Sequence, residues 1–162
     1  MPPEKHEFRK IMGQFATGVT VITTRDGDAL HGSTANAVSS LSLDPMMVLY
    51  CAEQTTDTLP ILRRSGVFAV NILAADQQEL SQRFANKDDP EAHDVSKVPH
   101  RFAVTGSPIL EGVLAYVDCR VVDALTRGDH TIFVGQVEAG QMASDSPPLL
   151  FFRGRYAELK DQ

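Results

Sequence analysis

A run of small and polar residues, Gly32–Pro45, is the first segment of this sequence that could hold a ligand. Small side chains let a flat ligand approach the backbone closely, while the hydroxyls and the Asn36 amide offer hydrogen-bond donors and acceptors. The alternative is an edge strand of small polar residues that ends in a serine-rich turn before Asp44 and Pro45. By itself, the pattern favours this structural alternative.

A second candidate lies in the segment Cys51–Thr58, where an apolar run leads into three threonines and the expected start of a helix. Hydroxyl groups and the free N–H groups of a helix N-terminus together suit a phosphate. Capping the helix would need only one of the threonines. Both interpretations stay open for this segment.

Two further segments combine turn residues with groups that suit a nucleotide. A long β-type run begins at Gly128-Asp129-His130, where an exposed His130 could meet a second ligand such as a nicotinamide amide or a pyrophosphate. Two arginines lie beside aromatic rings in Phe152–Tyr156, which suits a phosphate or an adenine. A turn in the first case and a bulge in the second explain these residues without a ligand, and each segment alone favours that explanation.

The composition excludes several classes of function. The chain has 162 residues and a formal net charge of −6, which fits one globular domain over residues 1–162 and gives no clustered cations for nucleic acid. Its apolar runs are too short to cross a membrane, and the charged segment Met1–Lys10 differs from a secretory signal. We therefore expect a cytoplasmic protein without a membrane or nucleic-acid partner.

Motifs of several other kinds of site are absent. The sequence has no GxGxxG after a strand, no GxxxxGK(S/T), no GxSxG, no CxxC and no HExxH. Four histidines are scattered without partners at ligand spacing: His31, His93, His100 and His130. Cys51 and Cys119 lie inside apolar runs and are expected to be free, buried thiols. We predict no metal site.

Hydrophobic patterns predict the elements that must position these residues. Phe8, Ile11, Met12 and Phe15 have the spacing of one apolar helix face, and Gly18 is expected to end that helix. Runs of apolar and β-branched residues predict strands over 19–24, 30–40, 46–52, 67–73, 114–124, 130–142, 149–152 and 156–159. Capping residues predict helices after 55–58 and over 76–84, and the polar segment 86–99 is expected to be a loop. Because strands outnumber helices and hairpins dominate, we predict an antiparallel barrel with a few helices.

Together, these segments resemble the short-chain NAD(P)H:flavin oxidoreductase family, the flavin reductase components of two-component flavin-dependent monooxygenases. The resemblance extends from about Phe8 to Tyr156, and the order and spacing of its segments make it specific. The segments that carry it are Phe15–Thr24, Ser39–Pro45, Phe68–Leu73, Gln77, Leu80-Ser81, Phe84-Ala85, Gly128–His130 and Pro148–Gly154.

The resemblance implies a fold that is mainly β with some α. This fold is an FMN-binding split β-barrel, antiparallel and Greek-key-like, with a few peripheral helices. The resemblance also implies a homodimer with the flavin near the dimer interface. It implies an oxidoreductase in which NADH or NADPH delivers hydride to FMN or FAD, and from which the reduced flavin passes to a partner oxygenase.

The resemblance also assigns residues to the site. Positions that line or adjoin the flavin are Thr34, Ala35, Asn36, Ser39, Ser40, Cys51, Ala52, Glu53, Phe84 and Ala85, with Thr58 near the phosphate. A C-terminal stretch that meets the nucleotide or the flavin corresponds to Arg153, Gly154, Arg155 and Tyr156. The Gly-Asp-His motif of the family is tied to the nicotinamide nucleotide, and it makes His130 the candidate catalytic residue.

Two other functions stay open at this point. A flavin-binding carrier or sensor on the same barrel would need no nicotinamide site, so the Gly-Asp-His segment weighs against it. An enzyme similar to pyridoxamine-phosphate oxidase would need more basic residues around a substrate phosphate than this sequence offers.

Overall fold

The structure is a computed structural model that describes residues 1–160. Its main feature is an antiparallel sheet of seven strands in the order β3-β2-β6-β9-β10-β5-β4. These strands are β2 (Thr20–Asp26), β3 (Ala29–Ala35), β4 (Val38–Leu43), β5 (Met46–Glu53), β6 (Val67–Ile72), β9 (Ala115–Arg127) and β10 (His130–Met142). Most of the predicted strands are present, and the hairpin predicted around Thr126–Asp129 joins β9 to β10.

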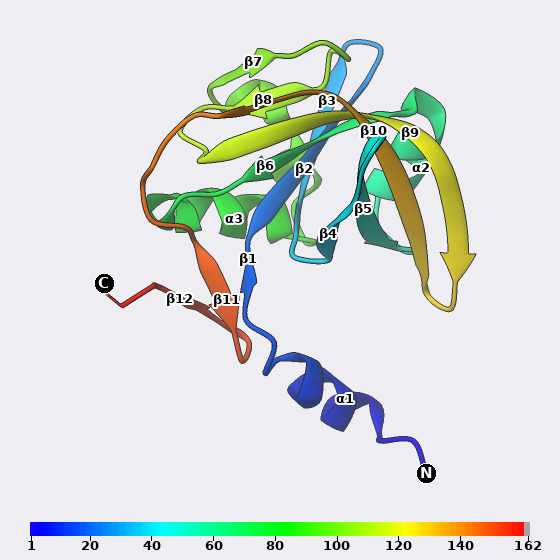
Figure 1. The fold of residues 1–162 in the computed structure, drawn as a ribbon, viewed down its shortest axis with the longest axis vertical. Helices are drawn as coiled ribbons and strands as arrows, with labels where there is room; N and C mark the ends of the chain where they lie inside the picture. The colour runs from blue at the N-terminus through cyan, green and yellow to red at the C-terminus, as the bar shows by residue number, and fades with distance from the viewer. Residues whose placement is uncertain (161–162) are drawn as a thin grey trace.

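The two edge strands of this sheet are consecutive in the chain. Only Asn36 and Ala37 separate β3 from β4, although the two strands lie at opposite ends of the sheet order. So short a connection requires the sheet to curl until its edges meet, which makes a barrel (Figure 1). The amide of Cys51 on β5 donates a hydrogen bond to the carbonyl of Ala37 at 3.0 Å and fixes this junction. The sequence predicted one strand over 30–40, and that prediction is wrong at the point where the barrel closes.

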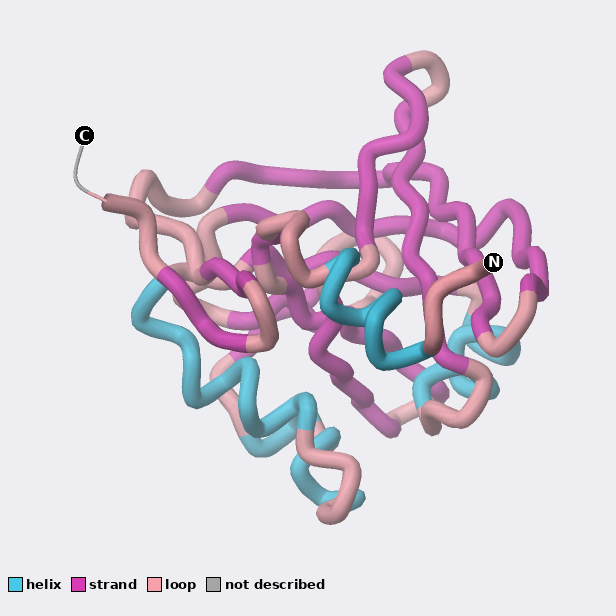
Figure 2. The backbone as a smooth tube through the Cα atoms, turned by 90° about the horizontal axis from the view of Figure 1, so that it is seen from below, coloured by secondary structure: helices cyan, strands magenta, loops and turns pink. Residues whose placement is uncertain are grey.

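Three α-helices lie at the periphery of the strands within residues 1–160 (Figure 2). They are α1 (Lys5–Met12), α2 (Thr58–Ser65) and α3 (Gln78–Ala85). Helix α2 ends as predicted at Gly66, whose φ of 66° is the left-handed conformation that favours glycine. No helix among these residues has the length and apolar character needed to cross a membrane.

Helix α1 extends away from the barrel beside a small C-terminal sheet (Figure 1). That sheet has the order β1-β11-β12, formed by β1 (Thr17–Gly18), β11 (Leu150–Phe152) and β12 (Arg155–Ala157). The helix ends at Gly13 and not at the predicted Gly18, which is paired with Leu150 in this sheet. None of the residues of α1 is buried, because the apolar face of the helix has no partner in the same chain.

The predicted loop over 86–99 is partly helical. It contains two short 3₁₀ helices, η2 (Pro90–His93) and η3 (Val95–Lys97), and a third, η1 (Ala75–Gln77), precedes α3. A two-stranded sheet of β7 (His100–Phe102) and β8 (Pro108–Leu110) follows. The segment was predicted to be a loop because most of its residues are polar. Two of its apolar residues, Ala92 and Val95, are buried and pack it against the barrel.

Two clusters of buried side chains form the main core. One fills the barrel and contains Phe68 and Phe133. The ring of Phe68 lies where a side chain of Gly135 would be, since a Cβ there would come within 2.5 Å of it. The second cluster joins the barrel to α3 and η3 through Phe84 and Val95, both fully buried. This second cluster fixes the helix and the turn that border the candidate site.

Candidate functional site

A cavity of about 460 Å³ opens where the barrel closes, at the junction between β3 and β4. Its walls come from β3, from the end of β5 with the loop to α2, from the end of α3 and from the start of β10. Nine of the predicted site residues line it: Thr34, Ala35, Asn36, Cys51, Glu53, Thr58, Phe84, Ala85 and His130. Barrel closure therefore brings together segments that are far apart in the sequence.

The β3 wall is pinned to α3 by a side-chain hydrogen bond. The hydroxyl of Thr34 donates to the carbonyl of Ser81 at 2.7 Å. Next to it, Gly32 faces the ring of Phe84, and a Cβ at this glycine would come within 2.8 Å of that ring. The absence of a side chain at Gly32 thus serves packing between the strand and the helix. The small residues Ala35 and Ala37 remain the ones that leave room in the cavity.

The loop between β5 and α2 supplies the hydroxyls predicted for a phosphate. Thr55, Thr56 and Thr58 all line the cavity. The hydroxyl of Thr56 donates to the carbonyl of Glu53 at 3.1 Å, and the buried hydroxyl of Thr58 lies 2.9 Å from Nε2 of His31. Two of the three hydroxyls therefore have partners in the protein, so the loop is held in place before any ligand binds.

A pair of stacked histidines, which the sequence did not predict, lies in the cavity wall. The rings of His31 and His93 are nearly parallel, with centroids 5.2 Å apart and an interplanar angle of 10°. Burial, followed by the charge of His93, lowers the pKa of His31 to about 4, and the carboxylate of Asp57 opposes the shift. His31 is therefore neutral at pH 7. No sequence signal marks this pair, because it depends on η2 folding back over β3.

One cation lines the cavity, and it was also missed. Nζ of Lys87 lies 2.9 Å from Oε2 of Glu53, and both side chains keep substantial solvent exposure. The hydrogen bond and the charge of Lys87 lower the pKa of the Glu53 carboxyl. This ion pair places the ammonium group of Lys87 beside the loop between β5 and α2, where an anionic ligand can take the place of Glu53 as its partner.

His130 lines the cavity from the first position of β10. Its Nδ1 lies 2.7 Å from Oδ1 of Asp129, and this hydrogen bond lowers the pKa of the Asp129 carboxyl. Because Nδ1 is committed to Asp129, Nε2 is the nitrogen available to a ligand. In the sheet, His130 is paired with Glu53 on β5, which sets the two side chains at the same end of the cavity.

A second, mainly apolar cavity of about 600 Å³ lies between α1, the C-terminal sheet and the barrel. Three residues border both cavities, namely Asn36, Ala37 and Cys51, so the two lie on either side of the β3–β4 junction. Three other predicted site residues border only this second cavity: Ser39, Arg153 and Gly154. Nε of Arg153 donates to Oε1 of Gln14 at 2.9 Å and ties the C-terminal turn to the end of α1.

Four predicted site residues border neither cavity: Ser40, Ala52, Arg155 and Tyr156. The side chain of Ala52 is fully buried in the barrel core, because alternate residues of β5 face opposite sides of the sheet. The hydroxyl of Tyr156 lies 2.8 Å from Oγ of Ser81, so this residue supports α3 from behind. Both cysteines, Cys51 and Cys119, are free thiols as predicted. Only Cys119 is buried as expected; Cys51 is half-buried, because it borders both cavities.

Comparison with known proteins gives matches over almost the whole chain. The family described as "Flavin reductase like domain" matches residues 12–160. The reductase subunit HsaB of a flavin-dependent monooxygenase from Rhodococcus jostii is 37% identical over 97% of this chain and 79% of its own. The solved structure of flavin reductase PheA2 has a TM-score of 0.90 at 40% identity, covering 98% of this chain and all of the other.

A further solved structure carries ligands. It is the NADH:FAD oxidoreductase SgcE6 of Streptomyces globisporus in complex with NAD and FAD fragments. Its TM-score is 0.90 at 31% identity, and the match covers 99% of this chain and 95% of the other. The predicted split-barrel fold is confirmed by these structures.

Proposed function

Since the chain belongs to the family of the flavin reductase-like domain, we propose that it transfers hydride from NADH or NADPH to FMN or FAD and supplies the reduced flavin to a partner monooxygenase. Two relatives support the two halves of this reaction. One is named a reductase subunit of a flavin-dependent monooxygenase, and the other is an NADH:FAD oxidoreductase. The protein is thus an oxidoreductase that works with a flavin and a nicotinamide nucleotide.

The observation that carries this proposal is a single cavity shared by two sets of residues. Thr34, Ala35 and Asn36, which the family resemblance assigns to the flavin, line the same cavity as His130, which it assigns to the nicotinamide nucleotide. Hydride transfer requires the two ligands to be in contact, so their sites must share one space. A phosphate of the flavin also finds a matching charge there in Lys87.

The residues of the cavity orient the ligands. A bound flavin supplies the hydride-accepting chemistry, so the protein needs no strong acid or base of its own. The small residues Ala35 and Ala37 leave room for a flat ring system, and the Asn36 amide offers donors to its polar edge. Nε2 of His130 can hold the nicotinamide nucleotide while Asp129 fixes the orientation of the imidazole ring.

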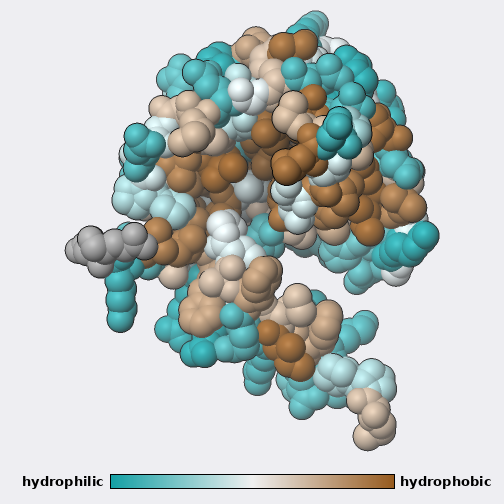
Figure 3. Space-filling view, viewed as in Figure 1, coloured by the Kyte–Doolittle hydropathy of each residue, from teal (hydrophilic) through white to brown (hydrophobic). Residues whose placement is uncertain are grey.

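The proposal includes a homodimer. The apolar side chains of α1 are about half exposed or more: Phe8, Ile11 and Met12 at 54%, 56% and 52%. Apolar side chains also gather on the barrel face toward α1 (Figure 3). A helix with an uncovered apolar face beside an apolar cavity of about 600 Å³ suits a second copy of the chain. A cytoplasmic location fits the proposed use of reduced nicotinamide nucleotides.

One experiment separates a reductase from a flavin carrier. Purified protein is mixed anaerobically with FMN and NADH, and the absorbance of oxidised flavin is followed, with FAD and NADPH in parallel reactions. A reductase bleaches the flavin at a rate proportional to enzyme concentration. A carrier or sensor binds the flavin and leaves it oxidised, and that result would refute the proposed function.

A further inference from the structure

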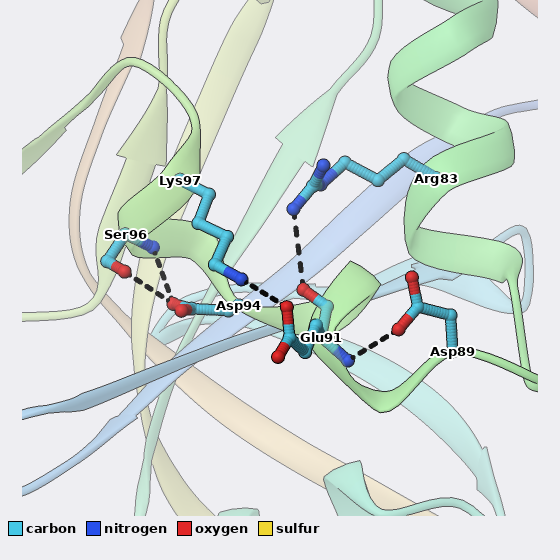
Figure 4. A network of polar contacts seen from close by, with 6 residues as sticks. All are labelled: Arg83, Asp89, Glu91, Asp94, Ser96 and Lys97. Carbon is cyan, nitrogen blue, oxygen red and sulfur yellow. Dashed lines mark hydrogen bonds and ion pairs between the residues drawn. The ribbon is translucent and has the colours of Figure 1, made fainter.

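His93 lies in a segment that carries a network of polar contacts (Figure 4). The network contains Arg83, Asp89, Glu91, Asp94, Ser96 and Lys97. Oδ1 of Asp89 accepts from the amide of Glu91 at 3.0 Å, and Nζ of Lys97 donates to Oε2 of Glu91 at 2.6 Å. Arg83 on α3 donates to the carbonyl of Glu91 at 3.4 Å and joins the network to the helix. The network therefore has members on both sides of His93 in the chain.

Both ring nitrogens of His93 bond to backbone carbonyls. Nδ1 lies 2.8 Å from the carbonyl oxygen of Gly32, and Nε2 lies 2.9 Å from that of Asn86. A carbonyl oxygen only accepts, so the ring nitrogen is the donor of such a bond. With both nitrogens occupied, the ring has no donor or acceptor left for a ligand. Its polar contacts all serve the protein backbone.

The two carbonyls belong to two neighbouring elements that border the cavity, β3 and the end of α3. Gly32 is on β3, where it contacts Phe84, and Asn86 directly follows the last residue of α3. On either side of Asn86, the residues Ala85 and Lys87 line the cavity. His93 thus bridges the strand to the end of the helix at the point where the chain turns to present Lys87.

His31 supports the bridge from the other side. Its ring stacks on His93, and its Nε2 lies 2.9 Å from the hydroxyl of Thr58 at the start of α2. The stack therefore extends the bridge from β3 and α3 to α2. All three elements border the cavity, and the histidine pair is where they are joined.

We propose that His93 is a positioning residue, which fixes the Ala85–Lys87 wall against β3 and thereby sets the affinity for the flavin without contacting the reacting atoms. This inference rests on the proposed function for the identity of the ligand. The positioning itself can be measured without any ligand.

The test compares His93→Phe with His100→Phe. Phenylalanine keeps a ring to stack on His31 and removes both hydrogen bonds. His100 is a matched control, because its Nδ1 also bonds to a backbone carbonyl, that of Val98 at 2.8 Å, and it does not line the cavity. Three quantities are measured: amide hydrogen exchange of ligand-free protein, the Kd for FMN by fluorescence titration, and the KM for NADH at saturating FMN.

For His93→Phe we expect faster exchange confined to residues 84–89 and a rise in the FMN Kd of about tenfold, which corresponds to about 1.4 kcal/mol. The KM for NADH should stay within about twofold, and His100→Phe should match the wild type. If His93→Phe does not fold, His93→Gln, whose amide can keep one of the bonds, should show the same local exchange and a smaller rise of about threefold.

Two results would overturn the proposal. One is wild-type exchange in residues 84–89 together with a wild-type Kd. The other is faster exchange spread over the whole barrel, which would indicate a general loss of stability. If the wild-type protein binds neither FMN nor FAD, the proposed function fails, and the exchange measurement alone still decides the role of His93.

Discussion

Nζ of Lys87 lies 2.9 Å from Oε2 of Glu53, and this ion pair joins the segment after α3 to the end of β5 at the edge of the cavity. Both side chains remain partly exposed, so the pair is weak and can open. A flavin phosphate would compete with Glu53 for the same ammonium group. The pair therefore makes the affinity for a phosphate-bearing ligand sensitive to single substitutions at either end.

We predict that Lys87→Gln raises the Kd for FMN about fivefold and leaves that for riboflavin within twofold, because only FMN carries the phosphate. Glu53→Gln should tighten FMN binding, since it frees the ammonium group. Fluorescence titrations with both flavins measure these values. Arg64→Gln is the matched control, because Arg64 forms a similar exposed pair with Asp26 at 2.8 Å and does not line the cavity. Equal losses for FMN and riboflavin would contradict a phosphate role for Lys87.

His130 gives a second prediction. His130→Ala should raise the KM for NADH by about tenfold or more and change the Kd for FMN less than twofold, because its free Nε2 faces the shared cavity while its Nδ1 bonds to Asp129. Steady-state kinetics at saturating flavin measure the first value. Asp129→Asn is the control, since it keeps an acceptor for Nδ1 and should have a smaller effect. An unchanged KM in His130→Ala would exclude this role.

The elements that were predicted correctly are those with local signals. The β9–β10 hairpin follows from Gly128 and Asp129, where glycine adopts a φ of 57°, and α2 ends at Gly66 for the same reason. The break at Asn36 and Ala37 has no local signal. It is set by the pairing of β3 with β2 and of β4 with β5, and such long-range pairings cannot be read from a run of small residues.

The residues of the candidate site also divide into those that have a local sequence signal and those that do not. Thr34, Glu53 and His130 were found because they belong to recognisable segments, and the structure places all three on one cavity. His93 and Lys87 were missed, because they lie in a polar segment that resembles a loop in the sequence. Their positions depend on the burial of Val95 and on the bonds of His93 to two distant carbonyls.

A substitution at Gly32 tests whether close packing requires a glycine at this position. In Gly32→Ala, the new Cβ would lie 2.8 Å from Cε1 of Phe84 and 3.0 Å from Cγ2 of Val95. We expect a loss in the free energy of unfolding of about 1–3 kcal/mol, measured by urea titration, because both neighbours are fully buried. Gly32→Ala with Phe84→Leu should recover part of this loss. No change in stability would show that Phe84 and Val95 can move to accept a methyl group, so that packing does not require glycine here.

The proposed homodimer predicts the effect of a charge on α1. Ile11→Asp should reduce the mass in solution from twice the chain mass of 17.7 kDa to the chain mass itself, because a carboxylate cannot be buried against an apolar surface without cost. Light scattering after size-exclusion chromatography measures the mass. Val104→Glu is the control, since Val104 is 72% exposed and lies between β7 and β8, at the opposite end of the molecule (Figure 1). A dimeric Ile11→Asp variant would place the interface elsewhere.

His31 predicts how stability depends on pH. Burial and the neighbouring His93 lower its pKa from 6.5 to about 4 in the folded protein. Between these values the unfolded state binds more protons, so the free energy of unfolding must fall as the pH falls from about 6.5 to about 4. The contribution of this one group is at most about 1.4 kcal/mol per pH unit. Urea titrations of His31→Gln at several pH values should show a shallower fall by up to this amount, since glutamine can still bond to Thr58 and does not titrate. Parallel curves for the variant and the wild type would show that His31 takes up no extra proton on unfolding.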